Sequence, residues 1–175
     1  MKTTVKGFVL KGVLKIVKKE KGEKGLKQLE QKFGSLKFSA FNDYPTETNA
    51  ELRKMAAEVI YGKHDEETEY LFGKITFESY ADSLIGKTMF SLLGNNLKKV
   101  AMGLPKILST VNKGLESEVE DLGSKKVRIR MKNNPYHIKY HEGVWAAGAE
   151  FFKEKYKITS RVLAPGDYEY VMEWK

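Results

Sequence analysis

The sequence contains no cysteine, which excludes disulfide bonds, thiolate catalysis and cysteine-based zinc or iron–sulfur sites. It also has no apolar run approaching the roughly 18 residues that span a bilayer, and no basic N-terminal segment followed by a long apolar one. We therefore expect no transmembrane segment and a cytoplasmic location. Glutamine is confined to Gln28 and Gln31, and lysine greatly outnumbers arginine. This composition is typical of heat-adapted proteins, so we expect a thermophilic source.

Charge is unevenly distributed along the chain. The net charge is +8, and residues 1–34 contain ten lysines against three glutamates. A basic face can attract nucleic acid or an anionic membrane surface. In residues 18–24, however, lysine and glutamate are interleaved as on a solvated surface, without an arginine cluster or an aromatic stacking platform. We expect no specific nucleic-acid binding, and the pattern leaves another anionic partner open.

Helical periodicity dominates the first two thirds of the chain. Apolar residues recur at i, i+3, i+4 and i+7 spacing between glycines and prolines. A capping box over residues 48–51 begins the most regular segment, and the acidic turn at Asp65 begins the next. The first few residues are also compatible with a strand because they are β-branched. The expected helices cover residues 5–17, 26–33, 48–60, 65–93, 97–102 and 105–113.

The last third of the chain alternates between strand and helix patterns. Apolar and polar residues alternate at period two over 127–132, 158–163 and 168–174, and a weaker strand is expected near 116–120. The last two strands are joined by a turn of only four residues, which cannot support a parallel crossover, so this pair must be antiparallel. Residues 140–156 have a helical pattern, and we expect this helix to cover one face of the sheet.

A chain of 175 residues can bury one sizeable core but divides poorly into two domains. We therefore expect a single domain, residues 1–175. Its class is α+β: an N-terminal helical subregion, residues 1–115, packs with a C-terminal ββαββ antiparallel sheet unit, residues 116–175.

A set of glycine, aromatic and apolar residues recurs at defined positions along the chain. They are Phe72-Gly73, Phe77, residues 80–87, Leu104-Pro105, residues 140–143 and Gly148. This pattern is similar to that of an uncharacterised paralogous family expanded in myxobacteria. The order of elements resembles the fold shared by haem–nitric-oxide/oxygen-binding (H-NOX) sensors, 4-vinyl-reductase-type small-molecule-binding domains and TRAPP trafficking subunits. The resemblance covers almost the whole chain and implies an H-NOX-like fold rather than a particular chemistry.

The resemblance fails at the residues that would hold haem. H-NOX domains bind haem through a histidine on the helix before the sheet, and a Tyr-x-Ser-x-Arg stretch holds the propionates. Residues 86–114 contain no histidine, and residues 127–132 offer no such stretch. Iron bound in that manner would lack its axial nitrogen. We therefore expect a domain that works without haem and has no cofactor.

Signals for catalysis or metal binding are weak. Gly86-Lys87-Thr88 ends like a phosphate-binding loop, but Ala81 replaces the first glycine and the segment has a helical pattern. His137 and His141 are four residues apart, yet Pro135 places His137 ahead of the helix, so we expect surface or capping roles rather than metal binding. We assign no catalytic residue and no metal site, and we expect that the protein is not an enzyme.

Two glycines, Gly143 and Gly148, lie inside the helix expected at 140–156. Each costs about 1 kcal/mol relative to alanine, so a favourable contact must offset them. Close approach of this helix to the sheet, or to a second copy of the chain, would supply that contact. The small residues could instead leave a slot for an apolar ligand, but we favour packing because small residues more often permit contact than create voids.

Two functions from different classes remain. The first is a non-catalytic sensor-type domain that holds a small apolar ligand between the helices and the sheet. Its pocket would be lined by Tyr80, Leu84, Met89, Met102, Leu104 and Trp145. The alternative is a protein-interaction or homodimerisation module resembling the trafficking-complex subunits, which fills the same space with its own side chains.

Overall fold

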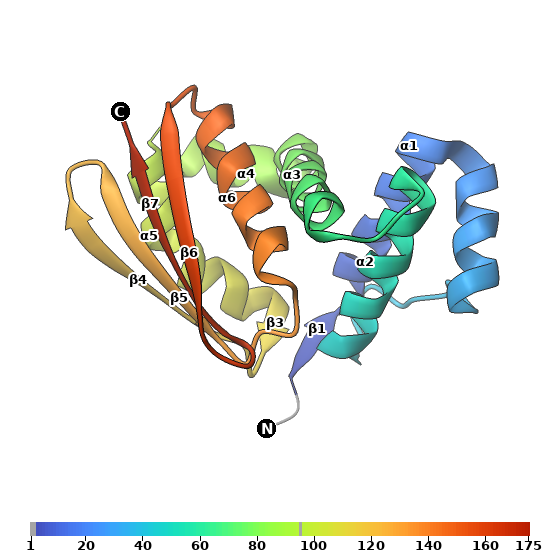
Figure 1. Cartoon of the computed structure of the whole chain (residues 1–175). Coiled ribbons are helices and arrows are strands. Elements are labelled where there is room, and N and C mark those ends of the chain that lie inside the picture. Colours follow the sequence, from blue (N-terminus) through green and yellow to red (C-terminus); the bar gives the residue numbers. More distant parts are fainter. Residues whose placement is uncertain (1–2, 95) are drawn as a thin grey trace.

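The computed structural model describes residues 3–94 and 96–175 (Figure 1). The elements, in chain order, are β1 (Thr4–Lys6), α1 (Gly7–Phe33), β2 (Asp43–Pro45), α2 (Thr46–Tyr61), α3 (Glu66–Asp82), α4 (Leu84–Leu93), α5 (Leu97–Val111), β3 (Asn112–Lys113), β4 (Glu116–Gly123), β5 (Lys126–Lys132), α6 (Ile138–Phe151), β6 (Tyr156–Ala164) and β7 (Asp167–Trp174). The α+β class with antiparallel sheets is confirmed. None of the helices in these residues is long and apolar enough to cross a membrane.

The N-terminal residues form a short strand and then a long, bent helix. Val5 is buried in β1, and α1 begins at Gly7. The bend lies at Gly22, whose φ of 64° and ψ of −160° interrupt the helix, and α1 ends before Gly34, which has a φ of 96°. Glycine favours both positions because it has no Cβ. The two halves of α1 correspond to the helices expected at 5–17 and 26–33, and the strand takes the first residues.

The capping box expected at residues 48–51 is wrong. α2 already begins at Thr46, so residues 48–51 lie inside the helix. The pairing of Thr4 with Pro45 between β1 and β2 fixes where the extended chain stops, and α2 follows at once. A capping box does begin α3, where Asp65 Oδ1 accepts from the Thr68 N–H at 2.9 Å and Thr68 Oγ1 accepts from the Asp65 N–H at 2.9 Å. The acidic start expected at Asp65 is confirmed.

The single helix expected over residues 65–93 is interrupted at Ser83. Ser83 has an extended backbone, with a φ of −70° and a ψ of 156°, and it separates α3 from α4. Its Oγ accepts from the Gly86 N–H at 3.0 Å and donates to the Tyr80 carbonyl at 2.6 Å. Serine side chains compete with helical hydrogen bonds in this way. The apolar period continues across the break, so the pattern alone does not reveal it.

The two short helices expected at 97–102 and 105–113 are one helix. α5 runs without interruption through Pro105. Proline in a helix interior lacks its N–H and costs on the order of 3 kcal/mol, which is why the sequence favoured a helix start there. Leu97 and Ala101 are buried in the core, and α5 packs on β4, so tertiary contacts offset that cost.

The C-terminal sheet has the strand order β4-β5-β7-β6 and is antiparallel throughout. All four expected strands are confirmed, as is the final hairpin. In the register, Ile129 of β5 lies opposite Val119 of β4 and Tyr170 of β7. This face is apolar and packs against α5 and α6, whereas the other face carries paired charged side chains such as Arg130 and Glu169.

Helix α6 lies between the four-stranded sheet and α3 (Figure 1). It therefore covers one sheet face, as expected. The helix ends at Phe151 rather than at residue 156, because Lys153 adopts a φ of 59° and Tyr156 already belongs to β6. Its glycines face α3 rather than the sheet: a Cβ on Gly148 would lie nearest to Phe77 of α3.

Candidate ligand-binding cleft

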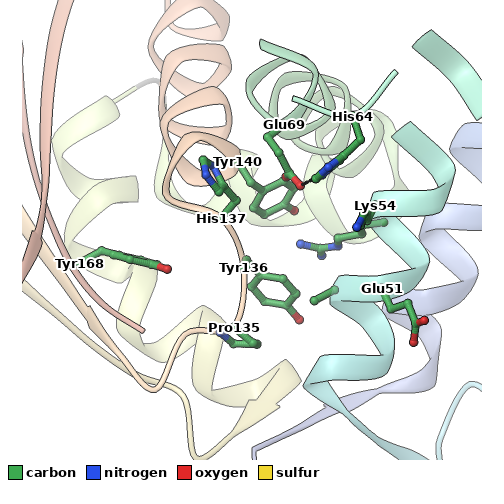
Figure 2. A pocket seen from close by; sticks show the side chains of 11 residues that line it. Glu51, Lys54, His64, Glu69, Pro135, Tyr136, His137, Tyr140 and Tyr168 are labelled. Carbon is green, nitrogen blue, oxygen red and sulfur yellow. Dashed lines mark hydrogen bonds and ion pairs between the residues drawn. The ribbon is translucent and has the colours of Figure 1, made fainter. Parts of the chain in front are cut away.

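A cleft of about 360 Å³ opens between α2 and the segment that joins β5 to α6 (Figure 2). Its lining residues come from α2, the turn after it, α3, the β5–α6 connection, α6 and β7. They are Ala50, Glu51, Arg53, Lys54, His64, Glu69, Pro135, Tyr136, His137, Tyr140 and Tyr168. We call this site the Arg53 cleft. It lies where the N-terminal helices meet the C-terminal unit of sheet and helix.

Arg53 is the most unusual residue of the cleft. Its guanidinium carbon lies 4.4 Å from the ring centroid of Tyr136 and 4.3 Å from that of Tyr140. Only 8% of the residue is exposed. Its Nε and Nη1 atoms are buried without a hydrogen-bond partner, and no carboxylate of residues 3–94 and 96–175 forms an ion pair with it. The positive charge of Arg53 thus lies against two aromatic rings, whose centroids are 5.7 Å apart, and not against a carboxylate.

The two tyrosine rings are positioned by buried contacts. Asn49, one turn before Arg53 on α2, donates from Nδ2 to the Tyr136 hydroxyl at 2.8 Å. The backbone N–H of Tyr136 donates to Asn134 Oδ1 at 3.1 Å. Tyr140 is buried on α6, and this burial raises the pKa of its hydroxyl even though the Arg53 charge opposes the shift. These contacts join α2 to the β5–α6 connection at the base of the cleft.

His141 lies behind the tyrosines and is only 5% exposed. Its ring packs 5.0 Å from Tyr140 and 5.7 Å from Trp145, and its Nδ1 lies 3.3 Å from Asn134 Nδ2. Burial, with a smaller contribution from the Arg53 charge, lowers the pKa of His141 to about 3. Its imidazole is therefore neutral near pH 7. The surface or capping role expected for His141 is wrong, because the residue belongs to the aromatic core.

The other histidines have partners on the surface. His137 is exposed and caps α6, with its Nδ1 accepting from the Lys139 N–H at 3.2 Å, so the capping role expected for it is confirmed. At the rim of the cleft, His64 Nε2 lies 2.6 Å from Glu69 Oε1 (Figure 2). Within residues 3–94 and 96–175, no three histidine or acidic side chains gather in a group that could hold a metal ion.

The residues expected to line an apolar pocket lie outside the Arg53 cleft. Only two of them are joined by a hydrogen bond: the Tyr80 hydroxyl donates to Met89 Sδ at 3.3 Å. Phe90 packs edge-on against Tyr80, with 6.2 Å between the ring centroids, so an aromatic ring occupies the space beside it.

The other four residues of that set are dispersed. Leu84 is 82% exposed and Met102 is 41% exposed. Leu104 is partly buried against the core, and Trp145 is buried with its Nε1 atom lacking a hydrogen-bond partner. A pocket formed by these residues stays a prediction.

The sequence pattern of α2 contains a signal for Arg53 that the expected buried face did not include. The buried face expected for the helix over 48–60 contained Leu52, Met55, Ala56, Val59 and Ile60; Leu52, Ala56 and Ile60 are buried, and Met55 and Val59 are partly buried against the core. Asn49 and Arg53, four residues apart, extend that face by a polar stripe and are buried as well. Two polar residues at helical spacing beside an apolar face indicate a second contact surface.

Solved H-NOX structures share the fold of this chain. An oxygen-binding H-NOX domain related to soluble guanylate cyclases is 14% identical, with a TM-score of 0.76 over 97% of this chain and 95% of that chain. A variant H-NOX of T. tengcongensis is 14% identical, with a TM-score of 0.75 over 97% of each chain. An Fe(II) unliganded variant from K. algicida is 10% identical, with a TM-score of 0.75 over 97% of this chain and 96% of that one. The protein is therefore an H-NOX-like α+β domain.

The particular family is defined by sequence. Over residues 1–175 the chain matches the family described as protein of unknown function (DUF2378), and it belongs to that family. No curated protein matches the sequence. The H-NOX part of the expected resemblance is confirmed at the level of the fold. The likeness to 4-vinyl-reductase-type domains and to TRAPP subunits stays a prediction.

The residues of this chain do not fit the haem that the fold family implies. α5 is the helix before the four-stranded sheet, and neither it nor its neighbours over residues 86–114 contain a histidine. The chain has three histidines: His64 pairs with Glu69, His137 caps α6, and His141 packs among aromatic rings with Asn134 at its Nδ1. A haem iron next to α5 would therefore find no imidazole there.

Proposed function

We propose that this chain is a non-catalytic, sensor-type domain that binds a small molecule in the Arg53 cleft and works without haem. The observation that carries this proposal is the position of the cleft. It lies at the junction of the N-terminal helices and the C-terminal unit, and its base is formed by the contact of Arg53 with Tyr136 and Tyr140. The likeness to H-NOX domains supports a binding role by analogy of fold.

A ligand in this cleft would contact both parts of the chain. Lys54 and Ala50 line it from α2, and Tyr168 lines it from β7. A molecule that binds better to one relative arrangement of the two parts shifts the equilibrium toward that arrangement. The domain could then report occupancy as a change in the position of α2 relative to α6. This coupling requires no chemical step on the ligand.

The lining of the cleft also favours binding over catalysis. Glu69 and His64 are paired with each other at the rim, and His137 caps α6. The lining residues include no serine, threonine or cysteine that could act as a nucleophile. We propose that the cleft orients a ligand but does not transform it.

Native mass spectrometry of freshly purified protein tests this proposal. The mass of the intact protein under native conditions is compared with its mass after denaturation, and we expect a small molecule that is released on denaturation. A stable dimer without any small molecule would instead support the alternative of a homodimerisation or protein-interaction module. The exposed Leu84 and Leu92 of α4, at 82% and 81%, would then be the first surface to examine.

A further inference from the structure

We propose that the ligand of the Arg53 cleft carries a carboxylate group, which pairs with the guanidinium of Arg53. This inference rests on the proposed function and specifies the chemical class of the ligand. The observation behind it is a buried arginine without a counter-ion in the wall of a cleft large enough for a small molecule.

The four arginines of the chain provide an internal comparison. Three of them lie on the charged face of the sheet around Glu169: Arg130 Nε and Arg161 Nη2 lie 2.9 and 2.7 Å from its carboxylate oxygens. Arg128 pairs with Glu120 at 2.6 Å. Each of these three is more exposed than Arg53, which has no carboxylate partner in the described part of the chain. The most buried of the four arginines is therefore the one that has no counter-ion.

Burial makes the lack of a counter-ion at Arg53 energetically costly. A guanidinium stays protonated at every physiological pH, so it cannot relieve the cost by losing its proton. Buried charges in proteins are normally paired, because moving an unpaired ion out of water is strongly unfavourable. An anion that enters the cleft would meet a buried charge that forms no ion pair with the described residues, and attraction between charges is strong where water is excluded.

The geometry of the aromatic contacts indicates where the anion would bind. Tyr136 and Tyr140 lie over Arg53 at 4.4 and 4.3 Å from its guanidinium carbon. Rings at this distance interact with the charge, and the Nε and Nη1 atoms have no hydrogen-bond acceptor among the residues that the structure describes. A guanidinium carries paired N–H donors, and a planar acceptor with two oxygens, a carboxylate, matches that donor geometry.

The surroundings favour an anion over a cation. The faces of Tyr136 and Tyr140 that could bind a cationic ligand are already beside Arg53. The lining also carries Lys54 and Glu51, which are exposed, and Glu69, whose carboxylate is engaged by His64 at 2.6 Å, so Arg53 is the buried charge of the cleft. Ala50, Pro135 and Tyr168 supply apolar surface for the rest of the molecule. A small carboxylic acid with an apolar body fits this combination.

The test compares acids with their amides by isothermal titration calorimetry on the wild-type chain. Phenylacetate is compared with phenylacetamide, and hexanoate with hexanamide, with inorganic phosphate as a third probe. At least one acid should bind about tenfold or more tightly than its amide, the preference expected for a hydrogen bond to a charged group. Equal binding of acids and amides, binding of phosphate but of neither acid, or no binding of either acid would each overturn the inference.

Two variants then test whether the preference for acids over amides depends on Arg53. Arg53→Met should abolish it, whereas Lys27→Met, which removes an exposed positive charge outside the cleft, should keep it. Loss of the preference in Lys27→Met alone would contradict the assignment to Arg53. If Arg53→Met does not fold, the comparison of acid and amide on the wild type still tests whether the cleft prefers a carboxylate. Native mass spectrometry separates the two proposals. A bound neutral molecule would support the proposed function but refute the carboxylate ligand. No bound molecule, together with no binding of either acid, would refute both proposals.

Discussion

Gly73 of α3 and Gly143 of α6 lie where these two helices cross, and each faces the backbone of the other helix. A Cβ on Gly73 would overlap the carbonyl oxygen of Tyr140, and a Cβ on Gly143 would overlap that of Tyr70. The contact is therefore reciprocal and leaves no room for a methyl group on either side. It brings α6 against α3 and thereby places Tyr140 beside Arg53.

Replacing either glycine by alanine should destabilise the protein. The obstructing atoms in Gly73→Ala and Gly143→Ala are backbone atoms, which cannot move aside as a flexible side chain does. Overpacking of this kind typically costs roughly 1–3 kcal/mol, which exceeds the gain of about 1 kcal/mol in helix propensity. Urea unfolding of the variants would measure the loss in free energy of unfolding.

Gly12 of α1 and Gly103 of α5 are matched controls for these variants. Both lie in helix interiors, and a Cβ at either position would meet no atom within 4 Å. Gly12→Ala and Gly103→Ala should therefore raise the free energy of unfolding by about 0.5–1 kcal/mol. Equal stabilisation in all four variants would show that α3 and α6 are not in close backbone contact.

Gly148 should behave differently from Gly143, although both lie on α6. A Cβ on Gly148 would lie 3.4 Å from Phe77 Cε2, a distance at which a methyl group nearly fits. We expect Gly148→Ala to change stability little, whereas Gly148→Leu should cost roughly 1–3 kcal/mol because its larger side chain must displace Phe77. Thermal melts measure both effects.

Ligand analysis by mass spectrometry should accompany these melts. Gly148 does not line the Arg53 cleft, so Gly148→Leu should lose stability without losing a bound molecule. If the larger side chain instead maintained stability and expelled the ligand, the space next to Gly148 would be the binding slot.

Acidification should destabilise the protein through His141. Burial lowers the pKa of this residue from 6.5 to about 3, so the unfolded chain takes up a proton below pH 6.5 that the folded protein does not bind until about pH 3. The contribution of neutral His141 is present above the unfolded pKa and is lost progressively as the pH falls between these two values. From about pH 7 to about pH 5 the expected loss is roughly 2 kcal/mol.

The variant His141→Phe separates this effect from the titration of other groups. It should lower stability at neutral pH, because Asn134 loses its partner, but the dependence of the free energy of unfolding on pH should weaken by about one proton between pH 6.5 and 5. An unchanged slope in His141→Phe would mean that His141 titrates normally in the folded protein.

Haem should not bind to this protein. The purified chain should be colourless and show no Soret band in its absorption spectrum, since residues 86–114 provide no axial histidine. Reconstitution with haem should yield no stoichiometric complex. A tight complex that was abolished by replacing His137 or His141 would overturn the roles assigned to these residues here.

Local patterns predicted much of the secondary structure but not where every element ends. The strands of the C-terminal sheet follow from alternation at period two, and the start of α3 follows from Asp65. At Ser83 and Pro105 the observed helix boundaries differ from the expected ones in opposite ways. Ser83 ends a helix within a continuous apolar period, whereas Pro105 continues through a helix that its chemistry disfavours. The break at Ser83 comes from local hydrogen bonds of its side chain, whereas at Pro105 contacts with other elements outweigh a local preference of a few kcal/mol.

The sequence by itself determined the α+β class, the antiparallel C-terminal sheet and the lack of a histidine on α5, because each depends on residue types and their spacing along one segment. Only the tertiary structure decided the Arg53 cleft. Arg53 on α2 lies far along the chain from Tyr136 and His141, and no local period relates it to them. Their contacts exist because Gly73 and Gly143 let α3 and α6 approach, and Asn49 then joins α2 to Tyr136. An arginine that looks like part of a solvated helix face in sequence thereby becomes a buried, unpaired charge.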